Sequence, residues 1–193
     1  MLGRRDVLGR AGDTPATTFG FTVIEILVVM TIILVLAGLI LATSSYVHNK
    51  GARSRAEAEI AAMSAALENY KADNGVYPSA PTLDPRTKGD PNQTGYKDAS
   101  LILYKAISGD DDRNRQAELT SYFSFKPNQL SPQTGDVDFI KDPFGNSYGY
   151  STAGQAGGGA GYNPTFDLWS TSNQTTDPLP ATDVITPRWI KNW

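Results

Sequence analysis

The sequence predicts an α+β protein in which a long amino-terminal helix spans a membrane and packs on a small antiparallel β-sheet head. From Ile26 to Ala42 the chain is an apolar run without a charge or a proline, which predicts a membrane-spanning helix. Further along, apolar side chains recur at the three- and four-residue steps of one helix face: Ile60, Met63, Leu67 and Tyr70. The second half of the chain contains short strand-like runs separated by turn residues, which predicts the sheet.

The apolar run has two other interpretations, a cleavable secretory signal and an ordinary amino-terminal anchor. With Phe21–Glu25 before it and Thr43–Val47 after it, the segment reaches the roughly 20 residues that span hydrocarbon. A secretory signal has an apolar core of about 7–15 residues followed by its cleavage site, whereas here the small residue, Gly20, comes first. An ordinary anchor would leave Glu25 unexplained, because a carboxylate in a membrane span is unfavourable.

The charges on the two sides of the span leave its orientation open. The polar segment before it carries three arginines and two aspartates. Lys50, Arg53 and Arg55 follow the span. Because the basic residues are balanced, the excess of positive charge that marks a cytoplasmic side does not decide between the two ends.

The helix is expected to continue through Lys50–Asn74, a segment rich in alanine, which is a strong helix former. Asn74-Gly75 is a good helix stop, and Pro78 follows just beyond it. The apolar stripe that begins at Ile60 is interpreted as the face that packs on the sheet, and not as a partner site.

A loop and a short helix are expected next. Pro78–Pro91 contains four prolines, which predicts a loop. Asp98 is a good amino-terminal cap for a short helix over Ala99–Ile107.

A possible calcium loop follows this helix. Asp110, Asp112 and Asn114 have the 1-3-5 spacing of such a loop. The pattern fails at its sixth position, where Arg115 replaces the required glycine, and at its twelfth, where Ser121 replaces a bidentate glutamate. We therefore interpret this segment as a solvated turn.

The remainder of the chain is expected to form antiparallel strands. Asp142–Gly145 has proline second and glycine fourth, which predicts a turn. Gly154–Gly161 is expected to be a flexible loop, and it lacks the Gly-Lys-Ser/Thr ending of a phosphate cradle. The strand-like runs are Tyr122–Phe125, Val137–Lys141, Ser147–Ser151 and Thr165–Thr171.

Composition excludes several function classes. The net charge of −3 gives no basic footprint, so nucleic acid is not an expected partner. The chain has no cysteine and one histidine, His48, so Ser-His-Asp, Cys-His and zinc arrangements are unsupported. We expect no enzyme and no catalytic residue. Without disulfides, the protein must be held by packing, hydrogen bonds or an ion.

Three groups of residues resemble the type IV pilin-like family, and in particular the major pseudopilins of type II secretion. The first is Gly20-Phe21 with Glu25 at the start of the span. The second is the run Leu67-Glu-Asn-Tyr-Lys-Ala-Asp-Asn-Gly-Val-Tyr-Pro78. The third comprises the Asp142-Pro-Phe-Gly-Asn146 hairpin, Phe166–Ser170, and an ending with Asp183 and Trp193.

The resemblance implies how the amino terminus is processed and used. A prepilin peptidase would cut after Gly20 and leave Phe21 as the N-methylated first residue, and Phe21 and Glu25 would serve assembly. The implied pilin-like organisation is a leader (1–20), a transmembrane and polymerisation helix (21–47), the soluble half of the stalk helix (48–76), an αβ loop with a short helix (77–118), and the antiparallel sheet with a carboxy-terminal loop (119–193).

The resemblance also raises a possible Ca²⁺ site in the carboxy-terminal loop, because family members bind calcium there through several aspartates. In this chain Gln174 and Val184 occupy two places where such acids would fall. Asp177 and Asp183 remain, and two acids with backbone carbonyls would bind Ca²⁺ weakly. No other cofactor is expected.

The resemblance implies a structural subunit of the type II secretion pseudopilus, which polymerises through its amino-terminal helix to help drive protein export across the outer membrane. Its partners would be further copies of itself in a helical homopolymer, minor pseudopilins, the inner-membrane secretion platform and the prepilin peptidase. It would cross the bacterial inner membrane once, with a periplasmic carboxy-terminal head. A type IV or competence pilus subunit and a non-polymerising membrane-anchored binding module remain alternatives.

Overall fold

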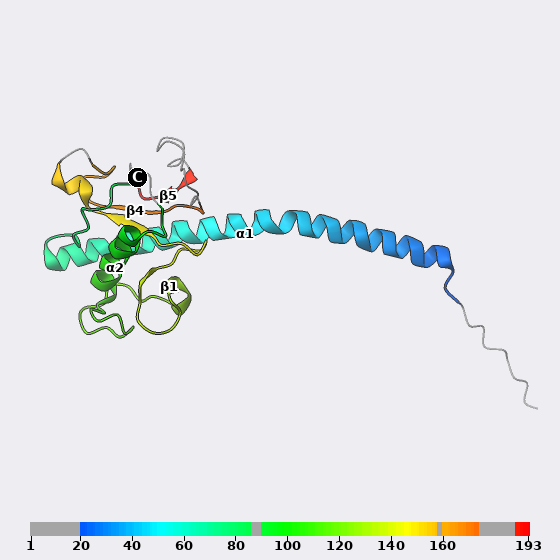
Figure 1. Cartoon of the computed structure of the whole chain (residues 1–193), viewed down its shortest axis with the longest axis horizontal. Coiled ribbons are helices and arrows are strands. Elements are labelled where there is room, and N and C mark those ends of the chain that lie inside the picture. Colours follow the sequence, from blue (N-terminus) through cyan, green and yellow to red (C-terminus); the bar gives the residue numbers. More distant parts are fainter. Residues whose placement is uncertain (1–19, 86–89, 158–159, 174–187) are drawn as a thin grey trace, which may run out of the picture. The chain divides into compact units, whose positions relative to one another are not determined.

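The computed structural model describes residues 20–85, 90–157, 160–173 and 188–193 (Figure 1). The chain divides into two compact units, Met1–Ser45 and Tyr46–Trp193, and we call the second the head unit. The helices are α1 (Val23–Asn74) and α2 (Thr94–Ser108), and the strands are β1 (Leu130–Ser131), β2 (Phe139–Ile140), β3 (Gly149–Ser151), β4 (Asp167–Ser170) and β5 (Ile190–Lys191). The predicted α+β pilin-like fold is confirmed.

Helix α1 contains 52 residues and ends where the sequence predicts. Gly75 adopts a φ of +80° and donates its N–H to the carbonyl of Lys71 at 2.7 Å, which closes the helix in the left-handed conformation that glycine favours. Three residues of the predicted apolar stripe are buried, because Ile60, Met63 and Leu67 are 4%, 1% and 0% exposed, and the fourth, Tyr70, is half-buried. The second half of α1 thus supplies one wall of the core.

Helix α2 begins earlier than predicted. Asp98 lies inside the helix and does not cap it. The carbonyl of Gln93 accepts the N–H groups of Tyr96 and Lys97 at 3.1 and 3.3 Å, so the first turn forms upstream of Asp98. That turn buries Tyr96 against Trp169, and this tertiary contact extends the helix beyond its sequence signal.

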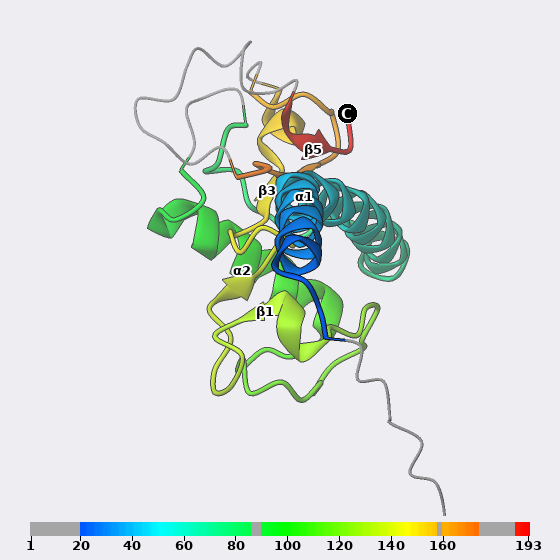
Figure 2. The same ribbon diagram turned by 90° about the vertical axis from the view of Figure 1, so that its right-hand side faces the viewer.

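The strands form two antiparallel sheets. β1 pairs with β2, with Leu130 opposite Ile140. β3, β4 and β5 form the other sheet in that order, with Gly149 opposite Trp169. α2 contacts β2 and β3. Figure 2 shows β5 and β1 on opposite sides of the head unit, with β3 and α2 between them.

Two predictions for this region were wrong. Tyr122–Phe125 forms no strand, because the N–H groups of Tyr122 and Phe123 donate to the carbonyl of Ile107 at the end of α2, both at 2.8 Å. Ala153–Ala156 forms a 3-10 turn where a flexible loop was expected. Gly154 approaches the carbonyl of Asn163 so closely that a Cβ atom would overlap it, so this glycine permits close packing.

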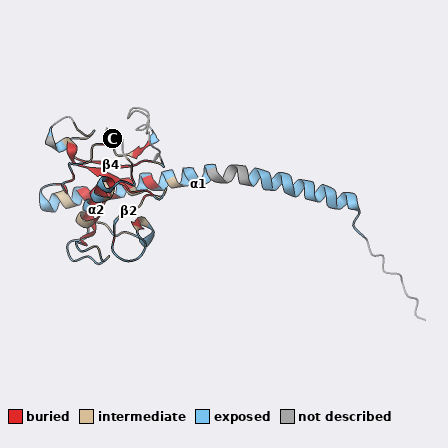
Figure 3. Cartoon of the chain, viewed as in Figure 1, coloured by how far each residue is buried: buried red, intermediate tan, exposed pale blue. Residues whose placement is uncertain are grey.

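Phenol–carboxylate hydrogen bonds reinforce the apolar core between α1 and the rest of the head unit. The Tyr148 hydroxyl donates to Glu59 at 2.7 Å, and its ring is fully buried. Burial and the Glu59 charge raise the pKa of Tyr148 far above its ordinary value, so this hydroxyl remains a donor. Tyr77 donates to Glu68 at 2.9 Å in the same way. Figure 3 shows buried residues concentrated where α1 crosses the head unit.

Candidate functional site

The amino-terminal segment carries the predicted processing and assembly residues. Gly20 and Phe21 precede α1, and the Phe21 ring is 79% exposed. Val23–Ile40 is the one segment among the described residues long and apolar enough to cross a membrane, and none of it is buried (Figure 3). An exposed apolar helix of this length requires an apolar environment, either lipid or other helices.

Thr22 and Glu25 form a capping box at the start of α1. The Glu25 carboxylate accepts the N–H and the hydroxyl of Thr22, each at 3.1 Å. The Thr22 hydroxyl in turn accepts the N–H of Glu25 at 3.3 Å. This reciprocal arrangement satisfies two amides that have no partner within the helix. Glu25 therefore has a local structural role in addition to its predicted role in assembly.

Sequence reasoning missed Thr22, although a signal for it was present. Thr22-x-x-Glu25 directly before an apolar run is the sequence pattern of a capping box. The predicted residues Gly20, Phe21 and Glu25 lie within one turn of the start of α1. A negative charge is also favourable there, because the first turn of a helix presents free amides.

The Asp142 hairpin links β2, β3 and β4 in the head unit. Asp142 is buried and accepts the N–H groups of Phe144 and Asn146 at 3.0 and 2.8 Å. Its other oxygen accepts the Ser170 hydroxyl of β4 at 2.6 Å. Burial raises the pKa of Asp142 to about 6 despite these three donors. The aspartate shapes the turn and joins it to the neighbouring strand, which is a structural role.

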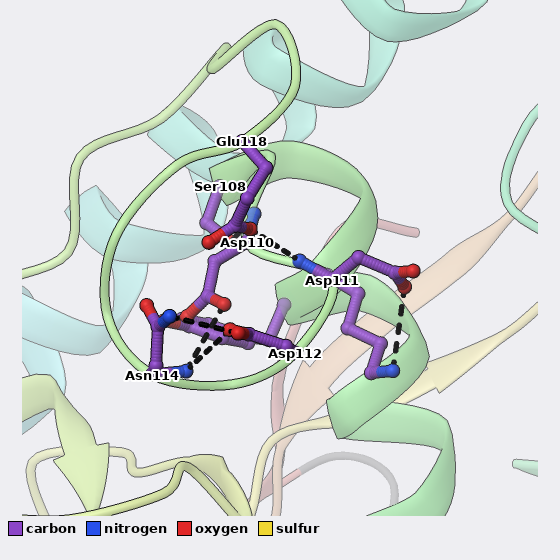
Figure 4. Close-up of polar contacts among 8 residues, drawn as sticks. Ser108, Asp110, Asp111, Asp112, Asn114 and Glu118 are labelled. Carbon is purple, nitrogen blue, oxygen red and sulfur yellow. Dashed lines mark hydrogen bonds and ion pairs between the residues drawn. The ribbon is translucent and has the colours of Figure 1, made fainter.

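The loop after α2 is held by a buried carboxylate, so its interpretation as a solvated turn was wrong for Asp110. Asp110 is 1% exposed and accepts the N–H groups of Asn114 and Arg115 at 3.1 and 2.7 Å. The Tyr104 hydroxyl donates to the same carboxylate at 2.5 Å. Asp112 also accepts from Asn114 (Figure 4). The aspartates thus accept hydrogen bonds from N–H groups of their own loop.

These acids also form the one group of three potential metal ligands found among the described residues. Asp110, Asp112 and Glu118 each offer a carboxylate oxygen within 4.8 Å of the others (Figure 4). All three already accept backbone N–H groups, since Glu118 accepts the N–H of Asp111 at 3.1 Å. A cation would compete with those donors, so the arrangement is explained as loop closure.

We expect the loop to make the stability of the head unit depend on pH. Burial raises the pKa of Asp110, but hydrogen bonds from Tyr104 and from backbone amides outweigh it, and the net pKa lies below the ordinary 3.8. The ionised carboxylate therefore stabilises the fold at pH values above the ordinary pKa. This stabilisation is lost as the pH falls through the lower pKa of the folded state.

We expect Asp110→Asn to lower the free energy of unfolding by about 1–3 kcal/mol at pH 7, because the new amide would oppose backbone donors. The difference in the free energy of unfolding between the variant and the unmodified chain should shrink below about pH 4. Urea unfolding at pH 7 and pH 3 measures this difference. Asp111→Asn is the matched control, because the Asp111 side chain is 77% exposed. Equal destabilisation by both variants would contradict the buried role.

The predicted calcium ligands Asp177 and Asp183 lie outside the described residues. The end of the chain is anchored by aromatic packing: Trp189 is 2% exposed and stacks on Trp169 with ring centroids 5.8 Å apart. Trp193 contacts Trp169 edge-on at 5.8 Å and stacks on Tyr162 at 4.6 Å. Burial of Trp189 and the ring contacts of the half-buried Trp193 therefore hold the end of the chain.

The fold and this amino terminus define a class: a small α+β head on a helix with a membrane-length apolar first half, capped by a carboxylate. The chain is similar to the type II secretion system core protein G of Escherichia coli K12, with 38% identity over 87 residues. The proteins of that name from Klebsiella pneumoniae and Pectobacterium carotovorum are 34% and 35% identical. The resemblance to type II secretion pseudopilins is thus confirmed.

These matches cover part of each protein. They include 37–40% of this chain and 53–61% of the relatives, so the chain spans little more than half the length of the curated relatives it matches. No family model matches the chain. No solved structure gives a significant match.

Proposed function

We propose that this protein is a subunit of a type II secretion pseudopilus that polymerises through the first half of α1. The observation that carries the proposal is a membrane-length apolar helix, exposed throughout Val23–Ile40, with a carboxylate in its first turn. Its similarity to type II secretion core proteins G supports the same assignment. The role is structural, and no catalytic residue is assigned.

The proposed cycle begins with the chain anchored once in the bacterial inner membrane and the head unit in the periplasm. A prepilin peptidase cuts after Gly20, and Phe21 becomes the N-methylated terminus. The Glu25 carboxylate then pairs with the terminal amine of a neighbouring copy within an otherwise apolar bundle. Minor pseudopilins and the inner-membrane secretion platform are the further partners. Growth of this homopolymer would help to move secreted proteins across the outer membrane.

Processing tests the proposal at its first step. In a host with a prepilin peptidase, the mature protein should begin at Phe21, and Gly20→Ala should largely block cleavage because the peptidase requires a minimal side chain there. Intact mass and amino-terminal sequencing measure both. Gly38→Ala is the matched control, because this glycine lies inside the span and nothing approaches it within 4 Å. A mature chain that still begins at Met1 would refute the proposal.

We also propose that Asp177 and Asp183 bind a calcium ion weakly and that this ion stabilises the end of the chain. An ion that binds only the folded state raises the free energy of unfolding by about 2.7 kcal/mol when its free concentration is a hundredfold above its Kd. Because Gln174 and Val184 replace two expected acids, we expect calcium or chelator to move the melting temperature of the chain by little or nothing. A large shift that Asp183→Ala abolishes would show that backbone carbonyls supply the missing ligands.

A further inference from the structure

A groove of about 510 Å³ lies where the end of α1 meets the second half of α2. We call it the distal groove, because it lies at the end of α1 that is farther from the apolar segment. More than half of its lining residues are apolar or aromatic: Tyr70, Pro78, Ile102, Ala106, Leu119 and Tyr122. Exposed apolar surface gathered at one place on a small protein marks a binding site. The distal groove therefore suits apolar side chains of a partner.

The loop that carries Leu119 is fixed against the end of α2. The carbonyl of Gly109 accepts the N–H groups of Glu118 and Leu119, both at 2.9 Å. Gly109 has a φ of +75°, and a Cβ atom on it would overlap the Leu119 carbonyl. The Leu119 side chain is nevertheless 67% exposed, and Ile102, which also lines the groove, is 38% exposed. A well-anchored backbone thus presents an apolar side chain to solvent at this groove.

A second exposed apolar surface lies at the start of the head unit. Tyr46 and Val47 are 70% and 65% exposed. Lys50 is also exposed and lies on the same side of α1, because residues three and four apart are neighbours on a helix. We call Tyr46, Val47 and Lys50 the proximal face. It follows the apolar segment that the proposed polymer buries between copies, so it continues that interface into the head unit.

The proximal face and the distal groove cannot meet within one chain. Val47 precedes Tyr70 by about 35 Å along α1, at 1.5 Å per residue. At 3.6 residues per turn, Val47 also lies about 140° around the helix from Tyr70 and about 180° from Asn74, the two α1 residues that line the groove. Parallel copies placed side by side meet through opposite sides. A neighbour shifted by about 35 Å along the polymer therefore brings its proximal face to the groove.

A contact of this kind joins two different surfaces of the same chain. Such heterologous contacts continue from copy to copy without closing when the rotation between copies does not form a ring, and they build filaments. The groove and the face thus have the arrangement that an open polymer requires.

The charges agree with this pairing. The proximal face contributes Lys50, and the sequence contains no acid between Glu25 and Glu57. In the groove Asp111 pairs with Lys105 at 3.4 Å. Asp73 is exposed at the edge of the groove, where it accepts the Tyr122 hydroxyl at 3.0 Å, and it pairs with no cation among the described residues. A lysine that meets this acid favours one register of the two copies.

We propose that the distal groove binds the proximal face of a second copy, with Tyr46 and Val47 against Ile102 and Leu119 and with Lys50 near Asp73. The contact joins heads that are staggered by about 35 Å along the filament. This inference rests on the proposed function, because it names the head surfaces through which the polymer is held in addition to the first half of α1.

Cysteine cross-linking tests the contact directly, because the chain contains no cysteine of its own. Val47→Cys/Leu119→Cys should give a ladder of disulfide-linked dimers, trimers and longer oligomers when sheared filaments are mildly oxidised. Each single variant should give no ladder. Val47→Cys/Gln93→Cys is the matched control, because Gln93 is exposed at the other end of α2. The ladder should disappear with Glu25→Ala, which prevents assembly.

A second variant measures what the groove contributes. Leu119→Gln should lower the ratio of filamentous to membrane-bound chain about tenfold, because each contact loses the burial of one leucine side chain. Val76→Gln is the matched control, because Val76 is 65% exposed and does not line the groove. An unchanged urea midpoint for Leu119→Gln shows that the head unit still folds.

Three results would overturn the proposal while polymerisation stands. The first is filaments of the double cysteine variant that give no ladder, together with equal yields from Leu119→Gln and Val76→Gln. The second is a dimer from Val47→Cys alone, which would place two proximal faces together. The third is normal Leu119→Gln filaments with impaired secretion, which would assign the groove to another protein. Absence of filaments from the unmodified chain would instead refute the proposed function itself.

Discussion

Glu25→Ala should abolish filaments while the chain still enters the membrane and is processed. In the proposed polymer the Glu25 carboxylate and the terminal amine of Phe21 from a neighbour form the one charged pair in an apolar bundle. Removal of one partner from a buried pair costs about 3–5 kcal/mol because the other charge is left without compensation. Every subunit contact in the filament carries this loss, so assembly should fall below detection. The yield of sheared filaments at equal membrane levels measures it.

The capping box provides the variants that separate assembly from helix capping. Glu25→Gln keeps a capping side chain, because glutamine also fits this position, but it removes the charge and should prevent filaments. Thr22→Ala removes the cap, at a cost of about 0.5–2 kcal/mol, but it keeps the carboxylate and should reduce filament yield only partly. If Glu25→Gln subunits assemble normally while Thr22→Ala subunits do not, Glu25 acts through the cap and the charged pair is refuted.

Gly149→Ala should strongly destabilise the head unit. Gly149 lies opposite Trp169 in the β3–β4 register, and a Cβ atom there would overlap the indole ring. Trp169 is 0% exposed and is enclosed by Trp189 and Trp193, so it has little room to move. Overpacking of this kind costs about 1–3 kcal/mol or more. All three tryptophans of the chain lie in this cluster, so tryptophan fluorescence during urea unfolding of the full chain in detergent reports it.

Two further variants test that explanation. Gly95→Ala lies in α2 with nothing within 4 Å, so it should be neutral or slightly stabilising. Trp169→Leu makes room opposite Gly149, so the loss from Gly149→Ala should be smaller in the Trp169→Leu background than in the unmodified chain. Strict additivity of the two changes would show that the methyl group does not act through the indole.

Sequence reasoning succeeded where local chemistry decides the structure. The apolar stripe at Ile60 and the Asn74-Gly75 stop fixed the buried face and the end of α1, because helical periodicity and a left-handed glycine need no distant partner. The Asp142–Gly145 turn was predicted for the same reason: the Gly145 N–H returns to the Asp142 carbonyl at 3.0 Å. These features depend on neighbours in the chain.

Prediction from the sequence failed where contacts between residues distant in the chain decide the structure. The start of α2 moved upstream of Asp98 because Tyr96 packs on Trp169, a residue of β4. Strand β5 had no sequence signal, because its two residues are fixed by pairing with β4. Asp110 was expected in solvent, but its burial depends on Tyr104 and on the fold of the following loop. The capping role of Glu25 was local and was missed only because Thr22 was not considered.

Polymerisation of this chain is the step on which its proposed function depends. Electron microscopy of shear fractions tests it most directly, in cells that produce the chain together with a prepilin peptidase and a type II secretion platform. We expect filaments that bind antibodies against the head unit and that disappear with Glu25→Ala. A chain that is cut after Gly20 and inserted in the membrane, yet yields no filament and no cross-linked oligomer, would contradict it.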